Sequence, residues 1–302
     1  MKRLILLVTF IFFGIFFTAC DTKSEHPDVV TTMFVHYDIV RQLADDYLTV
    51  ELLIPLGADV HSFEATSKDI VKIKNAKLFL FTSLELDTWI QDEKTIGGDQ
   101  TVVVNMSQSY ELDLEIVDEH DELHYWVDPI IFTQMIDYVL DHLLLIDPEH
   151  ADHYQRNANL YKQQVLDLHN DFITSSLSQS TLYFAGHNAF GLFGLRYDLT
   201  FVSLFPEFKP DDDLTSQEII SFSNAIREAQ TTFLFSEALI EPKAAKAIQN
   251  HLRTQNYQLS LLELHTYHNV SQSDWNQKIT YADLFARNID QLKQGLGVRD
   301  ND

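Results

Sequence analysis

The feature that most constrains the fold is an alternation of short apolar runs with amphipathic helical stretches, which occurs twice along the chain. The apolar runs have the length of strands and lie at residues 30–35, 50–54, 78–81, 101–104, 182–185, 201–204, 232–235 and 259–262. Helical periodicity marks residues 37–47, 67–76, 190–196, 216–229, 242–254 and 281–296. Strands that alternate with helices predict mainly parallel sheets covered by helices, one sheet in each half.

A long stretch without proline or glycine separates the two halves. Asp147 and Pro148 suit the cap and the first turn of a helix that continues to about Thr174. Such a helix is roughly 40 Å long, so we expect a stiff connector. The predicted fold is α/β, with lobes at 20–146 and 176–302 joined by one long rigid helix at 147–175. A hydrophobic content of 45% over 302 residues is enough to build both cores.

The N-terminus predicts export and a lipid anchor. Lys2 and Arg3 precede an apolar run that is shorter than a membrane-spanning helix, and Thr18 and Ala19 precede Cys20. This ending resembles the lipobox of bacterial lipoproteins, although Phe17 stands where leucine is usual. We expect residues 1–19 to be a signal peptide and Cys20 to carry lipid on the extracellular face of the cell membrane. The alternative is an ordinary signal peptide with a chance cysteine.

Composition excludes several classes of site and partner. Cys20 is the only cysteine, so the chain has no internal disulfide, and a lipidated Cys20 leaves no thiolate for metal binding or catalysis. The formal net charge of -24 repels nucleic acid and weakly attracts cations. Any metal site must therefore use the 13 histidines and the acidic residues.

Several histidines follow predicted strands, where ligands bind in open α/β sheets. His61 follows the second strand, His187 the fifth and both His265 and His268 the last, while His124 precedes a helix start at Asp128. Taken singly, each is more simply explained as a surface or hydrogen-bonded histidine. Their recurrence at one kind of position indicates a metal site, and four imidazoles would complete a tetrahedral zinc shell.

Enzyme motifs are weak by comparison. His120 and His124 have the spacing of a zinc-peptidase helix, but Asp121 stands where that motif requires glutamate, and the segment predicts a loop. Glu237 follows the seventh strand and could be a base or a ligand, although a cap or a salt bridge within the cleft is the simpler interpretation. A secreted zinc hydrolase would need an open coordination position, which four histidine ligands would not leave.

Three segments resemble the solute-binding lipoproteins of zinc and manganese ABC transporters. Residues 54–64 (IPLGADVHSFE) are similar to the family's P-x-G-x-D-P-H-x-F/Y-E, with Val60 in place of proline. Residues 124–129 (HYWVDP) are similar to H-x-W-L/M-D-P, and residues 187–193 (HNAFGLF) to H-x-A-F-x-Y-F/L. The likeness extends over nearly the whole mature chain.

This resemblance implies two lobes with one metal between them, bound by His61, His124 and His187. The family's fourth ligand lies before the last helix, where His268 falls nearest and His265 is the alternative; an acidic residue also remains open. An imidazole-rich shell favours Zn²⁺ over Mn²⁺. The implied function is capture of zinc and delivery to a membrane ABC permease, by a protein we expect to be monomeric and not an enzyme. Manganese transport, a zinc hydrolase and a metal-stabilised adhesin with a role in cell adhesion remain alternatives.

Overall fold

Two four-stranded parallel sheets form the two lobes of the computed structural model, which describes residues 26–112, 119–205 and 215–298. The strand orders are β2-β1-β3-β4 in the first lobe and β6-β5-β7-β8 in the second. The strands are β1 (Val29–Thr31), β2 (Val50–Leu52), β3 (Leu78–Phe81), β4 (Val102–Asn105), β5 (Thr181–His187), β6 (Thr200–Phe205), β7 (Phe233–Glu237) and β8 (Ser260–Leu264). The predicted fold class is therefore confirmed.

Helices cover both faces of each sheet, as parallel strands require. The α-helices are α1 (Phe34–Ala44), α2 (Ser67–Asn75), α3 (Glu93–Ile96), α4 (Pro129–Ile146), α5 (Ala151–Ile173), α6 (Gly191–Tyr197), α7 (Ser216–Glu228), α8 (Lys243–Thr254), α9 (Gln272–Asn276) and α10 (Tyr281–Leu296). The 3-10 helices are η1 (Met106–Gln108), η2 (Glu119–Val127) and η3 (Pro148–His150). Capping boxes begin α2, α7 and α10, at Thr66, Thr215 and Thr280.

The first strand and helix begin earlier than the sequence predicts. β1 ends at Thr31 and α1 already starts at Phe34, so the apolar run at 30–35 divides between a strand and a helix. Phe34 and Val35 are fully buried on α1. A short run of buried apolar residues does not distinguish a strand from a buried helix, because neither leaves a polar face.

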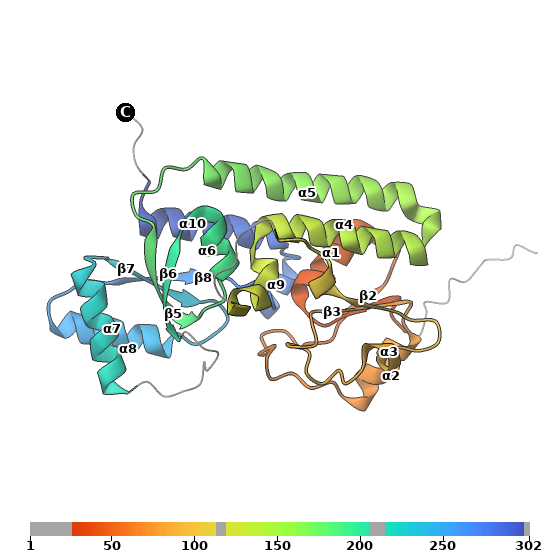
Figure 1. Cartoon of the computed structure of the whole chain (residues 1–302), viewed down its shortest axis with the longest axis horizontal. Helices are drawn as coiled ribbons and strands as arrows, with labels where there is room; N and C mark the ends of the chain where they lie inside the picture. The colour runs from red at the N-terminus through yellow and green to blue at the C-terminus, as the bar shows by residue number, and fades with distance from the viewer. Residues whose placement is uncertain (1–25, 113–118, 206–214, 299–302) are drawn as a thin grey trace, which may run out of the picture.

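The connector between the lobes is helix α5, preceded by η3. Asp147 ends α4, and its side chain accepts hydrogen bonds from Tyr154 and pairs with His150 Nδ1 at 2.8 Å. α4 runs back along α5, and Figure 1 shows α5 passing above both sheets. α4 is the one helix among the described residues long and apolar enough to cross a membrane, yet much of its surface packs in the interior.

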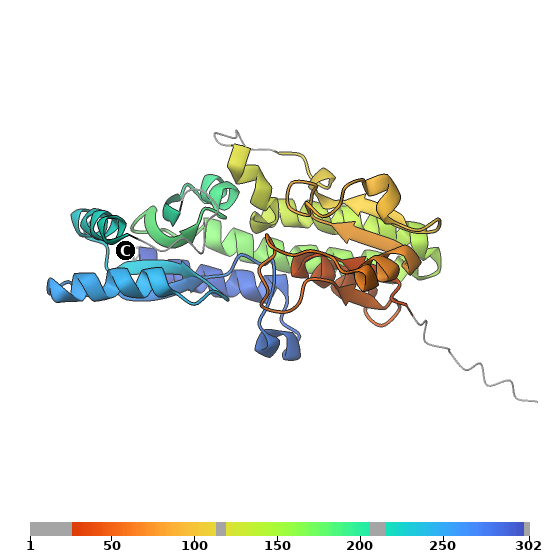
Figure 2. The ribbon, with the colours of Figure 1, turned by 90° about the horizontal axis from the view of Figure 1, so that it is seen from below.

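A single hydrophobic core runs through both lobes. It joins Val29 and Leu80 of the first sheet to Phe132 of α4, and continues to Phe184 and Phe285 of the second lobe. Smaller clusters lie under α2 and α3 on one side and under α7 and α8 on the other. Figure 2 shows the two lobes side by side along the long helices. The predicted signal peptide at 1–19 and Cys20 lie outside the described residues.

Candidate metal centre

His61 lies in the irregular segment between β2 and α2. The chain turns at Gly57, whose φ of 72° is the left-handed conformation that glycine adopts without strain. The His61 N–H donates to Asp59 Oδ1 at 2.9 Å, which closes a local turn. Val60 is buried in the core and so anchors the backbone next to the half-buried His61.

His124 lies at a kink in η2, where its φ of −108° and ψ of 39° are not helical. The segment is therefore not the continuous α-helix that a zinc-peptidase motif needs. Asp128 caps α4, with its Oδ1 accepting from Ile130 N at 2.8 Å, and Pro129 occupies the first turn. Arg196 Nε donates to Asp128 Oδ2 at 2.8 Å, which ties the segment that carries His124 to α6.

His187 is the last residue of β5, a central strand of the second sheet. The pairing with β6 shifts register between Phe184 and His187. Such an irregularity redirects side chains at the end of a strand. His187 is buried, and its position at the carboxyl end of a central parallel strand is where ligand sites form in open α/β sheets.

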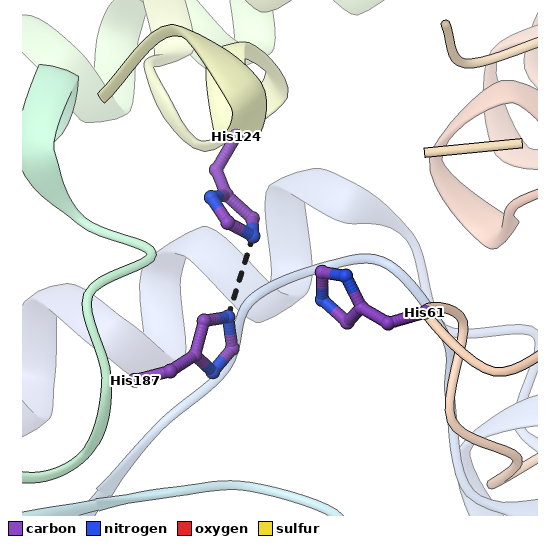
Figure 3. Close-up of side chains that lie close together, drawn as sticks. All are labelled: His61, His124 and His187. Atoms are coloured by element: carbon purple, nitrogen blue, oxygen red, sulfur yellow. Dashed lines mark hydrogen bonds between the residues drawn. The ribbon is translucent and has the colours of Figure 1, made fainter. Parts of the chain in front are cut away.

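The structure brings His61, His124 and His187 together, as Figure 3 shows. Each offers a ring nitrogen that lies within 4.8 Å of the other two. His124 Nε2 and His187 Nε2 are 3.3 Å apart. Three convergent imidazole nitrogens match the ligand chemistry of zinc and leave room for a fourth ligand. The donor set therefore fits a transition-metal ion.

Glu237 supports His187 from behind. Its buried carboxylate lies at the end of β7, with Oε2 2.9 Å from His187 Nδ1, while Oε1 accepts from the Thr266 hydroxyl at 3.2 Å. Burial acts to raise the pKa of Glu237, but the bond to His187 and nearby imidazole charges hold it below its usual value. An ionised carboxylate on Nδ1 leaves the Nε2 lone pair of His187 for a metal.

Both oxygens of Glu237 are thus engaged in positioning other side chains. The interpretation of Glu237 as a salt-bridging residue within the cleft agrees with this arrangement better than a general base does. Thr266 had no distinguishing signal in the sequence, because nothing local marks its contact with a glutamate 29 positions earlier in the chain.

His268 is buried beside the cluster but is not part of the three-histidine group. Its Nδ1 lies 2.5 Å from Thr266 Oγ1, and burial lowers its pKa, with smaller effects from the charge of Glu237, which raises it, and of His187, which lowers it. His265 instead lines a separate cavity, together with Asp274 and Arg287, that none of the three clustered histidines borders. Its Nδ1 accepts from Tyr267 N at 2.9 Å. Of the two candidates for a fourth ligand, His268 is therefore the one that lies nearer the three clustered histidines.

Burial lowers the pKa of two imidazoles at this site, those of His61 and His268. Burial, followed by the charge of His187, lowers the pKa of His61 to about 4. Burial is also the largest cause of the lowered pKa of His268. Neutral imidazole is the form that binds metal, so these side chains need not lose a proton before they bind an ion.

Solved structures of related proteins share this fold. The zinc-bound ZnuA-like domain of Streptococcus pneumoniae AdcA superposes with a TM-score of 0.76 at 22% identity, covering 90% of this chain and 99% of that one. The Bacillus subtilis metal-dependent lipoprotein YcdH superposes with a TM-score of 0.76 at 26% identity, covering 89% of this chain and 98% of that one. The Streptococcus agalactiae laminin-binding protein Lmb, described as an adhesin with metal-transporting activity, has a TM-score of 0.74 at 23% identity and covers 90% of this chain and all of its own.

Sequence comparison leads to the same group. The high-affinity zinc uptake protein ZnuA of Bacillus subtilis is 25% identical over 296 residues, 93% of this chain and 91% of the relative. The zinc-binding lipoprotein AdcA of Streptococcus pneumoniae is 22% identical over 313 residues, 97% of this chain but only 61% of the longer relative. The family model for the periplasmic component A of the zinc-uptake complex matches residues 29–295, which is most of the chain, and the chain therefore belongs to that family of solute-binding proteins.

Proposed function

We propose that this protein captures Zn²⁺ outside the cell and delivers it to a membrane ABC permease. The observation that carries the proposal is the meeting of three imidazoles, one of them fixed by a buried carboxylate. The zinc-uptake names of the related proteins support the same function. Zinc is the transported substrate here, and the ligands hold it only until the permease takes it.

His61, His124 and His187 bind the ion in this proposal, and His268 supplies the fourth ligand. His268 is buried beside the cluster, and its approach to the ion completes the tetrahedral shell that zinc prefers. Imidazole donors favour zinc over Mn²⁺, because manganese prefers oxygen ligands and forms weaker complexes with nitrogen. Mn²⁺ transport is the alternative for the same site.

The remaining parts of the proposal concern place and partner. Lipid on Cys20 anchors the protein at the outer face of the cell membrane, with one acyl chain giving only marginal attachment. The metal-loaded monomer docks on the permease, which opens the site. A difference in permease affinity between the loaded and empty states couples metal capture to recognition.

Metal content and competition titrations test the site. The chain from Asp21 onward includes every described residue and is purified without an affinity tag. We expect one tightly bound Zn²⁺ per chain that Mn²⁺ displaces poorly. Alanine substitution of His61, His124, His187 or His268 weakens zinc binding.

His169→Ala is the matched control, because His169 lies on the linking helix α5, pairs with Tyr197 of α6 and has no part in the cluster. Equal zinc binding by the control and the His187→Ala variant would refute the site. A preference for Mn²⁺ in the unaltered protein would replace the metal and keep the transport function. Unchanged zinc affinity in His268→Ala alone would remove His268 from the ligand set.

A further inference from the structure

The loop between β8 and α9 contacts the segments that carry His61 and His124, and the carboxylate that pairs with His187. This bridging loop (residues 265–270) belongs to the second lobe. The Thr266 carbonyl accepts from Trp126 Nε1 at 2.8 Å, two residues beyond His124. The Thr266 hydroxyl donates to Glu237, the carboxylate behind His187. The bridging loop therefore contacts the supports of both His124 and His187.

Asn269 makes the corresponding contact to the segment of His61. Its Nδ2 donates to Pro55 O at 2.8 Å and to Ala58 O at 2.9 Å. Its Oδ1 accepts from Val270 N at 2.8 Å, which sets the orientation of the amide. Asn269 is only 1% exposed, so water does not compete for these bonds. One buried side chain thus joins the second lobe to the turn at residues 55–58.

That turn lies directly before His61. Its own closing bond runs from Ala58 N to Pro55 O at 3.0 Å, and both carbonyls that bind Asn269 belong to the same two residues. No helix or strand lies between Leu52 and Ser67 in this part of the described chain. The position of the His61 imidazole therefore depends on tertiary contacts. The Asn269 amide provides one of them, which links the turn to the lobe that carries His187.

The backbone of the bridging loop is held in an uncommon conformation. Tyr267 has a φ of 60°, in the left-handed region that non-glycine residues rarely adopt. Its ring packs against Tyr281 with centroids 4.4 Å apart, and its hydroxyl accepts from Asn288 Nδ2 at 2.6 Å. Such strain persists where surrounding contacts enforce it, commonly at ligand sites. The enforced turn carries Asn269 to the first lobe.

We propose that Asn269 is a positioning residue that holds the turn at 55–58 and so places His61 for metal binding. This inference rests on the proposed function, because it assigns His61 to the zinc site. Asn269 itself touches no metal. Loss of its two hydrogen bonds releases His61 alone, because His124 and His187 have separate supports in the same loop.

The test compares Asn269→Ala with the unaltered chain in two measurements. Zinc affinity and release rate come from competition with a chelator. Hydrogen exchange of residues 55–63 is followed without metal. We expect a loss of affinity of about 10- to 100-fold, which is the usual effect of removing a group that orients a ligand. The loss appears as faster release, together with faster exchange at 55–63.

A double-substitution cycle separates positioning from general damage. In a His61→Ala chain, Asn269→Ala should cause no further loss, because the residue it positions is already gone. Asn157→Ala is the control. Asn157 lies on the linking helix, and its Nδ2 donates to Leu43 O at 3.1 Å. This substitution should leave the rate of zinc release unchanged. If Asn269→Ala fails to fold, Asn269→Ser replaces it, because serine is too short to span both carbonyls.

Unchanged release and unchanged exchange in Asn269→Ala would overturn the inference, as would an additive loss with His61→Ala. A His61→Ala chain with normal zinc affinity would instead refute the assignment of His61 to the metal site. Exchange at 55–63 would still decide whether Asn269 holds the turn, because that measurement needs no metal.

Discussion

Replacing Glu237 with glutamine tests how the buried carboxylate contributes to the metal site. The side chain is 4% exposed, and its Oε2 lies 2.9 Å from His187 Nδ1. Glutamine has nearly the same shape and still offers an oxygen acceptor to the imidazole. The substitution therefore removes the negative charge while keeping the tautomer that points Nε2 toward the cluster.

The magnitude follows from the type of hydrogen bond. A bond to a charged group contributes about 1.5–3 kcal/mol, against about 0.5–1.5 kcal/mol between neutral groups. The difference of roughly 1–1.5 kcal/mol corresponds to about a tenfold loss of zinc affinity for Glu237→Gln. Glu237→Ala also leaves the Nδ1–H without an acceptor, so we expect a loss nearer 100-fold, the upper end for such supporting groups.

Zinc affinity by chelator competition measures both variants, with thermal unfolding of the metal-free proteins to establish that the fold is intact. Glu263→Gln removes a charge from an exposed residue of the neighbouring strand β8 and is the matched control. Equal affinities for Glu237→Gln, Glu263→Gln and the unaltered chain would refute the reasoning. A Glu237→Gln loss as large as that of alanine would show that charge, and not the tautomer, dominates.

Three further substitutions test the fold. Burial lowers the pKa of His36 to about 3, below its usual 6.5. The stability that the neutral His36 contributes is therefore complete above about pH 6.5 and is lost as the pH falls toward 3. In denaturant titrations, His36→Leu should make the free energy of unfolding depend less on pH. Both ring nitrogens of His36 are buried without partners, so the same variant should gain about 1–3 kcal/mol at pH 7. Arg196→Leu leaves the fully buried Asp128 without its cation and should cost about 3–5 kcal/mol, partly restored by adding Asp128→Asn. Gly295→Ala places a Cβ 2.3 Å from the Phe235 ring and should lower the unfolding free energy by about 1–3 kcal/mol, whereas an unchanged melting temperature would contradict the tight packing.

Local pattern was sufficient for most of the fold. The runs at 78–81 and 281–296 coincide with β3 and α10, because the first is a short apolar run of strand length and the second has a helical period that starts at a capping box. The sequence marked only the start of α4, at Asp128 and Pro129, and not its full length. α4 is apolar around much of its circumference, so it lacks the polar stripe that identifies an amphipathic helix.

The sequence likewise predicted only some of the residues of the candidate site. Position after a strand selected His61 and His187, and position before a helix start selected His124; the structure brings these three together. The resemblance favoured His268, which lies nearest the last helix, and left His265 open, since both follow β8 within four residues. The left-handed turn at Tyr267 separates the two side chains, so that His265 lines another cavity while His268 lies beside the cluster.

The sequence by itself determined the two parallel sheets, the linking helix and the set of histidines from which a metal site could be built. These features follow from short-range periodicity and side-chain chemistry, and both can be read from a short segment of sequence without the rest of the chain. Only the tertiary structure decided which histidines converge, and that Glu237 and Asn269 support them. Those contacts join segments as far as 214 residues apart, and their geometry is set by how the lobes pack around the linking helix.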